Sequence, residues 1–104
     1  VPRFGADFAY TMDGDVEGCI EYQNFNAAAA VFRIRGVNVH PGSAKGIKKN
    51  AGANAWEVQS LLPAEEVPEK TEGYEGFFHL ISVTGEVAEA KLTYIIRDHN
   101  REKF

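Results

Sequence analysis

Five stretches of the chain carry the pattern of β-strands, in which apolar side chains return at about every second residue. They are residues 8–12, 18–25, 27–37, 77–83 and 91–97. The run of alanines at 27–30 favours a helix by propensity. The aromatic and β-branched residues that follow it favour a strand. The first stretch ends in Asp13-Gly14, a common turn signal.

Alternation also assigns the faces of two strands. Residues 27–37 place arginines at positions 33 and 35, between apolar residues, and residues 91–97 alternate in the same way. The side chains expected on the buried face of the first strand are Ala30, Phe32 and Ile34, and those expected to share one face of the second are Leu92, Tyr94 and Ile96. Arg33 and Arg35 are expected on the open face, and the other face of residues 91–97 carries Lys91, Thr93, Ile95 and Arg97.

The apolar period changes between residues 44 and 62. Ile47, Ala51, Ala55, Val58 and Leu62 follow one another at spacings of four, four, three and four, which is one stripe of an amphipathic helix. Ser43 is the predicted N-cap and Pro63 the predicted stop. Gly52 weakens such a helix by about 1 kcal/mol relative to alanine, and we interpret it as a point of close packing on the sheet.

The expected fold is α+β: an antiparallel sheet with one helix on one face. A second helix is expected to start at Asn100, and with a further strand it would complete a ferredoxin-like βαββαβ unit. The chain begins with Val1-Pro2-Arg3 and ends at Phe104, which indicates a piece of a larger protein. An unpaired sheet edge then predicts self-association of the isolated chain.

Composition narrows the class of function. The 104 residues are 44% hydrophobic and 25% charged, enough for one domain with a core. The net charge of -4 argues against a nucleic-acid partner. No apolar run reaches the roughly 18 residues of a membrane span, and no leader is recognisable. Cys19 is the only cysteine, which favours a reducing, cytoplasmic compartment.

Residues 38–46 hold the densest set of chemically capable side chains. His40 stands before Pro41-Gly42, and a lysine and a second glycine follow within four residues. A proline and two glycines predict a stiff corner that would hold the imidazole at a fixed height. A surface histidine with no role is the alternative, because nothing nearby supplies zinc-ligand spacing.

Five blocks of sequence resemble the peptidase T family of zinc aminotripeptidases. They are FGADFAYTMDG (4–14), NFNAA (24–28), VHPGSAKG (39–46), TEGYEGF (71–77) and YIIRD (94–98). The blocks follow in the family's order over the length of the chain. They cover only the lid, or dimerisation, domain of that family and the strand that leads into it.

The resemblance implies a domain division and an activity. Residues 1–18 would be a strand and turn leading in from an absent catalytic domain, and 19–104 a lid/dimerisation domain truncated at its second helix. The parent enzyme would be a cytoplasmic homodimer that removes the N-terminal residue of tripeptides with two zinc ions. The chain alone is expected to be inert and to bind no zinc.

The resemblance also implies residue roles. Asp13 would ligate one zinc, and His40 would stabilise the oxyanion, often in the partner subunit's site. Arg97 would bind the C-terminal carboxylate of the peptide, while Asn50 and Tyr74 would line the substrate. The acidic stretch 14–19 departs from the glycine-rich turn expected after Asp13, which leaves the local conformation there open.

Two alternatives stay open at this point. One is a non-catalytic α+β interaction or dimerisation domain, and the other is the lid of a related di-zinc carboxypeptidase or deacylase. The TEGYEGF block (71–77) argues against the second of these. If His40 and Arg97 bind substrate, we expect them to share one exposed side of the domain, whereas an interaction domain has no reason to keep them together.

Overall fold

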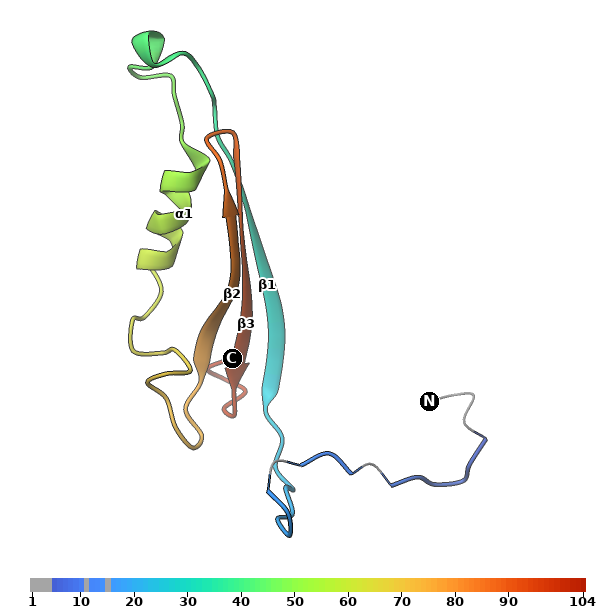
Figure 1. Cartoon of the computed structure of the whole chain (residues 1–104). Coiled ribbons are helices and arrows are strands. Elements are labelled where there is room, and N and C mark those ends of the chain that lie inside the picture. The colour runs from blue at the N-terminus through green and yellow to red at the C-terminus, as the bar shows by residue number, and fades with distance from the viewer. Residues whose placement is uncertain (1–4, 11, 15) are drawn as a thin grey trace.

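The computed structural model describes residues 5–10, 12–14 and 16–104. Three strands form one antiparallel sheet in the order β1-β3-β2, and helix α1 lies along one face of it (Figure 1). The elements are β1 (Asn26–Arg35), the 3-10 turn η1 (Pro41–Ser43), α1 (Ala51–Ser60), β2 (Phe77–Gly85) and β3 (Glu89–Asp98). The expected α+β class is confirmed, and the chain order β1-α1-β2-β3 gives the first part of a ferredoxin-like unit.

β3 is the central strand, and its pairing fixes the rest of the sheet. It pairs with β1 over its whole length, from Asn26 opposite Asp98 to Arg35 opposite Glu89. It pairs with β2 through a short hairpin, with an irregularity in the register between Leu80 and Ser82. β1 and β2 are therefore both edge strands of the sheet in this chain.

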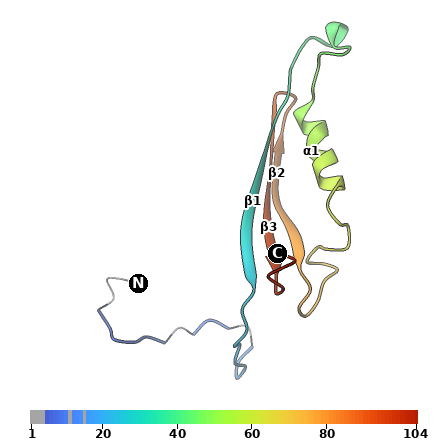
Figure 2. The same ribbon diagram turned by 180° about the vertical axis from the view of Figure 1, so that it is seen from behind.

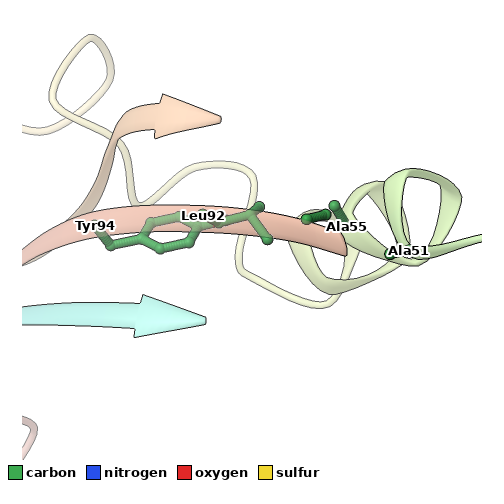
Figure 3. Packing of buried hydrophobic residues seen from close by; sticks show 5 residues of the cluster. Ala51, Ala55, Leu92 and Tyr94 are labelled. Atoms are coloured by element: carbon green, nitrogen blue, oxygen red, sulfur yellow. The ribbon is translucent and has the colours of Figure 1, made fainter. Parts of the chain in front are cut away.

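The core lies between β3 and α1 and is small. Its buried members are Ala51, Ala55, Ala90, Leu92 and Tyr94, and four of these are labelled in Figure 3. Because the helix contributes alanines, it can lie close to the larger Leu92 and Tyr94 of the strand (Figure 3). The Tyr94 hydroxyl donates a hydrogen bond of 2.6 Å to Gln59 Oε1, and burial raises the pKa of Tyr94.

The faces predicted from alternation are confirmed. Leu92 and Tyr94 are buried, and Ala30, Ile34 and Ile96 pack against them. Phe32 is 42% exposed, yet its ring meets the Tyr94 ring edge to face at 5.8 Å. The β1 side chains assigned to the core and the β3 side chains expected to share a face thus lie on the side of the sheet that α1 covers.

The predicted helix begins later than expected, at Ala51 rather than at residue 44. Its N-cap is Asn50, whose Oδ1 accepts a hydrogen bond from the Ala53 N–H at 3.2 Å, and Ser43 lies in η1 instead. A bridge between Val37 and Lys49 holds the chain extended just before the helix. Ile47, predicted in the helix stripe, is consequently outside the helix and 56% exposed.

Gly52 lies where α1 meets the hairpin, but an added Cβ would stand 3.4 Å from Asn50 Oδ1 and 3.5 Å from the Glu86 carbonyl oxygen, so the close packing expected there stays a prediction. The backbone N–H groups of Ala51 and Gly52 donate to the carbonyls of Val87 and Glu86, each at 3.0 Å. These carbonyls belong to the turn between β2 and β3, so the turn accepts two N–H groups from the first turn of α1, where a helix has no acceptors of its own. The helix is thereby anchored to the hairpin at its first turn.

The two strands predicted before residue 26 are wrong for the residues that the structure describes. Positions 5–10, 12–14 and 16–25 contain no strand, whereas residues 11 and 15 lie outside the described part. Ile20 and Tyr22, which alternate with polar neighbours, are exposed. A strand needs a partner strand, and among the described residues β1 pairs only with β3.

The residues after β3 form a hydrogen-bonded turn, and the second helix expected to start at Asn100 stays a prediction. Asn100 Oδ1 accepts hydrogen bonds from the backbone N–H groups of Glu102 and Lys103, at 2.8 and 3.2 Å. The Phe104 N–H donates to the Asn100 carbonyl at 3.1 Å, a helical four-residue step. Asn100 therefore acts as the N-cap of a single turn.

Candidate functional site

The loop that carries His40 projects beyond one end of the sheet (Figure 1). At its base, the backbone N–H of Val37 donates to the Lys49 carbonyl at 2.8 Å, and the Lys49 N–H donates back at 3.1 Å. Gly36 lies next to this pair, where an added Cβ would overlap the carbonyl oxygens of Val87 and Lys49. Only glycine fits there, and residues 38–48 form a protrusion with a fixed base.

His40 is the N-cap of η1 and accepts two hydrogen bonds from it. Its carbonyl oxygen accepts the Ser43 N–H at 2.9 Å, and its side-chain Nδ1 accepts the Gly42 N–H at 3.1 Å. The side chain is exposed. The imidazole is thus held by its own loop and presented outward.

Asn50, a sequence-predicted substrate residue, stands at the foot of the same loop. Its side-chain oxygen caps α1 through Ala53, so half of its amide has a structural role. It also lines a shallow hollow of about 510 Å³ together with Trp56 and Val83. The structure brings Asn50 and His40 to the same end of the domain.

Arg97 lies near the opposite end of the sheet, on β3. Its neighbour Ile96 packs against the core, so Arg97 is on the face away from α1. Its guanidinium carbon lies 4.5 Å from the ring centre of Phe25 and 6.0 Å from that of Phe77. In the described part of the chain no carboxylate forms a salt bridge with it, and it borders a hollow of about 530 Å³.

Tyr74 joins the surroundings of Arg97 through a small aromatic cluster. The Tyr74 hydroxyl donates to Gln23 Oε1 at 2.7 Å, and its ring meets the His99 ring edge to face at 5.0 Å. The His99 ring in turn lies 6.1 Å from Phe25, the residue under Arg97. Tyr74 and Arg97, which both carried a predicted substrate role, are therefore near one another.

Sequence reasoning assigned no role to His99 or Phe25. The spacing of both residues relative to Arg97 could have indicated that they lie near it. His99 follows Arg97 by two residues, and Phe25 precedes Ala27, the β1 partner of Arg97, by two. Because side chains two apart along a strand share a face, this spacing points to a common cluster once the pairing is known.

His40 and Arg97 lie at opposite ends of the domain, as Figure 2 shows from behind with the η1 loop and the end of β3 far apart. Arg97 pairs with Ala27, and the run from Ala27 to Arg35 spans about 27 Å before the His40 loop begins. The expectation that the two residues share one side is therefore wrong for a single chain.

Asp13, the predicted zinc ligand, is exposed. Within residues 5–10, 12–14 and 16–104 no group of three or more His, Cys, Asp and Glu side chains could hold a metal ion. A single carboxylate is not a metal site. The described residues therefore do not fit a complete zinc site.

Comparison with known proteins decides the family. A model of the peptidase dimerisation domain matches residues 22–104. The chain belongs to this family. The curated relatives include peptidase T of Bacillus subtilis (strain 168), 59% identical over 104 residues, and peptidase T of Staphylococcus carnosus (strain TM300), 58% identical over 104 residues.

These matches cover 100% of this chain but only 25% of each of those two relatives. The predicted resemblance to peptidase T and the assignment as its lid/dimerisation domain are confirmed. The boundary at residue 19 stays a prediction. Among the described residues, no helix is both long and apolar enough to cross a bilayer.

Proposed function

We propose that this dimerisation domain serves an aminotripeptidase, in which it helps to bind the peptide and to pair two subunits. The observation that carries the proposal is the 59% identity to peptidase T of Bacillus subtilis over all 104 residues of the chain. The matched region spans the loop of His40 and the end of β3 with Arg97. We place the enzyme in the cytoplasm, in keeping with a lone cysteine.

The chemistry of bond cleavage lies outside this chain in the proposed function. The two zinc ions that the family resemblance implies need a set of ligands, and the described residues do not provide one. Asp13 would contribute one carboxylate to a site built mostly by other parts of the enzyme. The domain's own contribution is to bind and orient the peptide.

Arg97 is the proposed anchor for the C-terminal carboxylate of the tripeptide. A guanidinium offers a planar fork of N–H donors that matches a carboxylate. Phe25 and Phe77 flank it without consuming those donors, since an aromatic ring binds the cation through its face. A fixed anchor at one end of the substrate would select peptides by length.

His40 is the proposed donor to the carbonyl oxygen that becomes negatively charged. Because Arg97 of the same chain lies at the other end of the sheet, the two residues can act on one tripeptide only if they come from different subunits. The observed separation thus supports a site completed by the partner subunit's loop. Asn50, at the foot of that loop, would approach the same substrate.

A second copy of the chain is the proposed occupant of the surface where α1 and β2 meet. Trp56 of α1 is 75% exposed and Val83 of β2 is 51% exposed, and both line one hollow. β2 is an edge strand, so its unpaired backbone groups can extend the sheet into another subunit. The family match to a peptidase dimerisation domain points to the same kind of partner.

Activity on a tripeptide with added zinc, measured on this chain and on the whole protein, tests the proposal. Hydrolysis by the whole protein alone, lost in His40→Ala and Arg97→Ala, is the expected result. Activity in the 104-residue chain would place the catalytic centre elsewhere. If both are inactive, the interaction domain without chemistry is favoured, an alternative that the separation of His40 and Arg97 within one chain also supports.

A further inference from the structure

His40 uses one ring nitrogen to close its own loop. Nδ1 accepts the backbone N–H of Gly42 at 3.1 Å, while Nε2 has no hydrogen-bond partner among the described residues. A backbone N–H can only donate, so the nitrogen that receives it carries no proton. The proton of the neutral imidazole must then be on Nε2.

We propose that the Gly42 N–H is a positioning group that holds the neutral imidazole of His40 in the tautomer protonated at Nε2. His40 then presents a hydrogen-bond donor to a carbonyl oxygen of the peptide. With Nδ1 occupied and Nε2 already protonated, the ring cannot act as a base towards the substrate. This inference rests on the proposed function and specifies which atom of His40 performs it.

The identity of residue 42 supports the assignment. A Cβ at position 42 would lie 3.2 Å from Nδ1 of His40, which is tighter than ordinary packing, and 3.5 Å from Cε1, which is an ordinary contact. Gly42 is not among the glycines with positive φ, so its backbone accepts other residues. Glycine is therefore favoured here by the imidazole that packs on it.

Nitrogen-15 spectroscopy of the whole enzyme, labelled at the histidine ring nitrogens, tests the tautomer directly. The signal of His40 is identified by its loss in His40→Gln. At a pH where the ring is neutral, we expect a bare Nδ1 and a protonated Nε2. A proton found on Nδ1 would overturn the inference and leave the proposed function standing.

Two substitutions of His40 distinguish the roles of its two ring nitrogens, Nδ1 and Nε2. In His40→Asn the side-chain oxygen can still accept the Gly42 N–H, but the outer donor is lost, and kcat should fall about 100-fold. In His40→Gln an amide N–H reaches the position of Nε2, and kcat should stay at least about tenfold above that of His40→Asn. Equal losses overturn the donor assignment, and no loss in either overturns the proposed function.

Gly42→Ala tests the positioning residue, with Ser43→Ala as its matched control in the same turn. The added methyl displaces the ring by a few tenths of an ångström, so kcat should fall about tenfold and some proton should appear on Nδ1. Ser43→Ala keeps its backbone bond to His40 and should behave as the parent. An unchanged kcat and tautomer in Gly42→Ala would overturn the role of Gly42.

Discussion

The guanidinium of Arg97 lies over the ring of Phe25, with 4.5 Å between the guanidinium carbon and the ring centre. Phe25 directly precedes β1, whereas Arg97 is near the end of β3. The contact therefore joins the segment that enters the sheet to the strand at its centre. It orients a positive charge while leaving its N–H donors free for an anion.

Arg97→Lys is expected to raise KM for tripeptides by about tenfold or more, because lysine lacks the bidentate fork. Steady-state kinetics on the whole enzyme would measure this, with Arg33→Lys, at the far end of the open face, as the control. A tripeptide with an amidated C-terminus should bind equally weakly to the parent and to Arg97→Lys. An unchanged KM for the free acid would argue against the carboxylate anchor.

Dimers of two different variant chains test whether one active site uses His40 of one subunit and Arg97 of the other. Co-expressed His40→Ala and Arg97→Ala chains should recover roughly a quarter of the parent activity, since half of randomly paired dimers are mixed and each mixed dimer keeps one intact site. The matched control is each variant expressed alone. Activity no higher than in these controls would mean that His40 and Arg97 act from the same chain.

Trp56→Glu should shift the whole enzyme from dimer towards monomer, because it places a charge in the apolar hollow beside Val83. Analytical ultracentrifugation at several concentrations would measure the shift. Leu61→Glu is the matched control: Leu61 is 79% exposed at the end of the same helix but does not line the hollow. Equal dimerisation of both variants would place the interface elsewhere.

Gly36→Ala should destabilise the domain by about 1–3 kcal/mol, because its Cβ has to displace the carbonyls of Val87 and Lys49. Gly14→Ala, where an added Cβ meets nothing within 4 Å, should change the free energy of unfolding by less than about 0.5 kcal/mol. Urea denaturation of the two variants compares them. Equal stability of the two variants would show that the backbone at the base of the His40 loop can shift to accommodate the added methyl group.

Tyr94 makes stability fall at alkaline pH. Burial raises its pKa above the ordinary value of 10.0, so above pH 10 the hydroxyl ionises more readily in the unfolded chain than in the folded one. Its contribution is complete below pH 10 and is lost as pH rises through the raised pKa. The midpoint of denaturation should therefore fall less steeply with alkaline pH in Tyr94→Phe than in the parent.

The fold was predictable where the decisive contacts follow the local apolar spacing. Leu92 and Tyr94 alternate on β3, and Ala51 and Ala55 recur at helical spacing, so their burial followed from the sequence. The start of the helix did not, because Ile47 continues the helical spacing while the distant pairing of Val37 with Lys49 keeps the chain extended. The local apolar pattern favours helix at this point, but the pairing of Val37 with Lys49 determines the extended conformation.

The residues proposed for the candidate site came from the sequence, but their arrangement did not. The identities of His40 and Arg97 came from sequence resemblance. Their separation depends on the register that sets Ala27 opposite Arg97, and spacing along the chain does not reveal a register. The aromatic contact with Phe25 was hidden for the same reason.

The ten paired positions of β1 and β3 set the length of the sheet. On the proposed two-subunit site, the length of the sheet sets how far each His40 loop reaches from its own Arg97 towards the neighbouring one. Adding one residue to each strand would turn the following side chains to the other face. The length of the paired strands can therefore change only in steps of two residues, or about 7 Å. If the proposed two-subunit site is right, the number of residues in these strands contributes to substrate specificity together with the side chains at their ends.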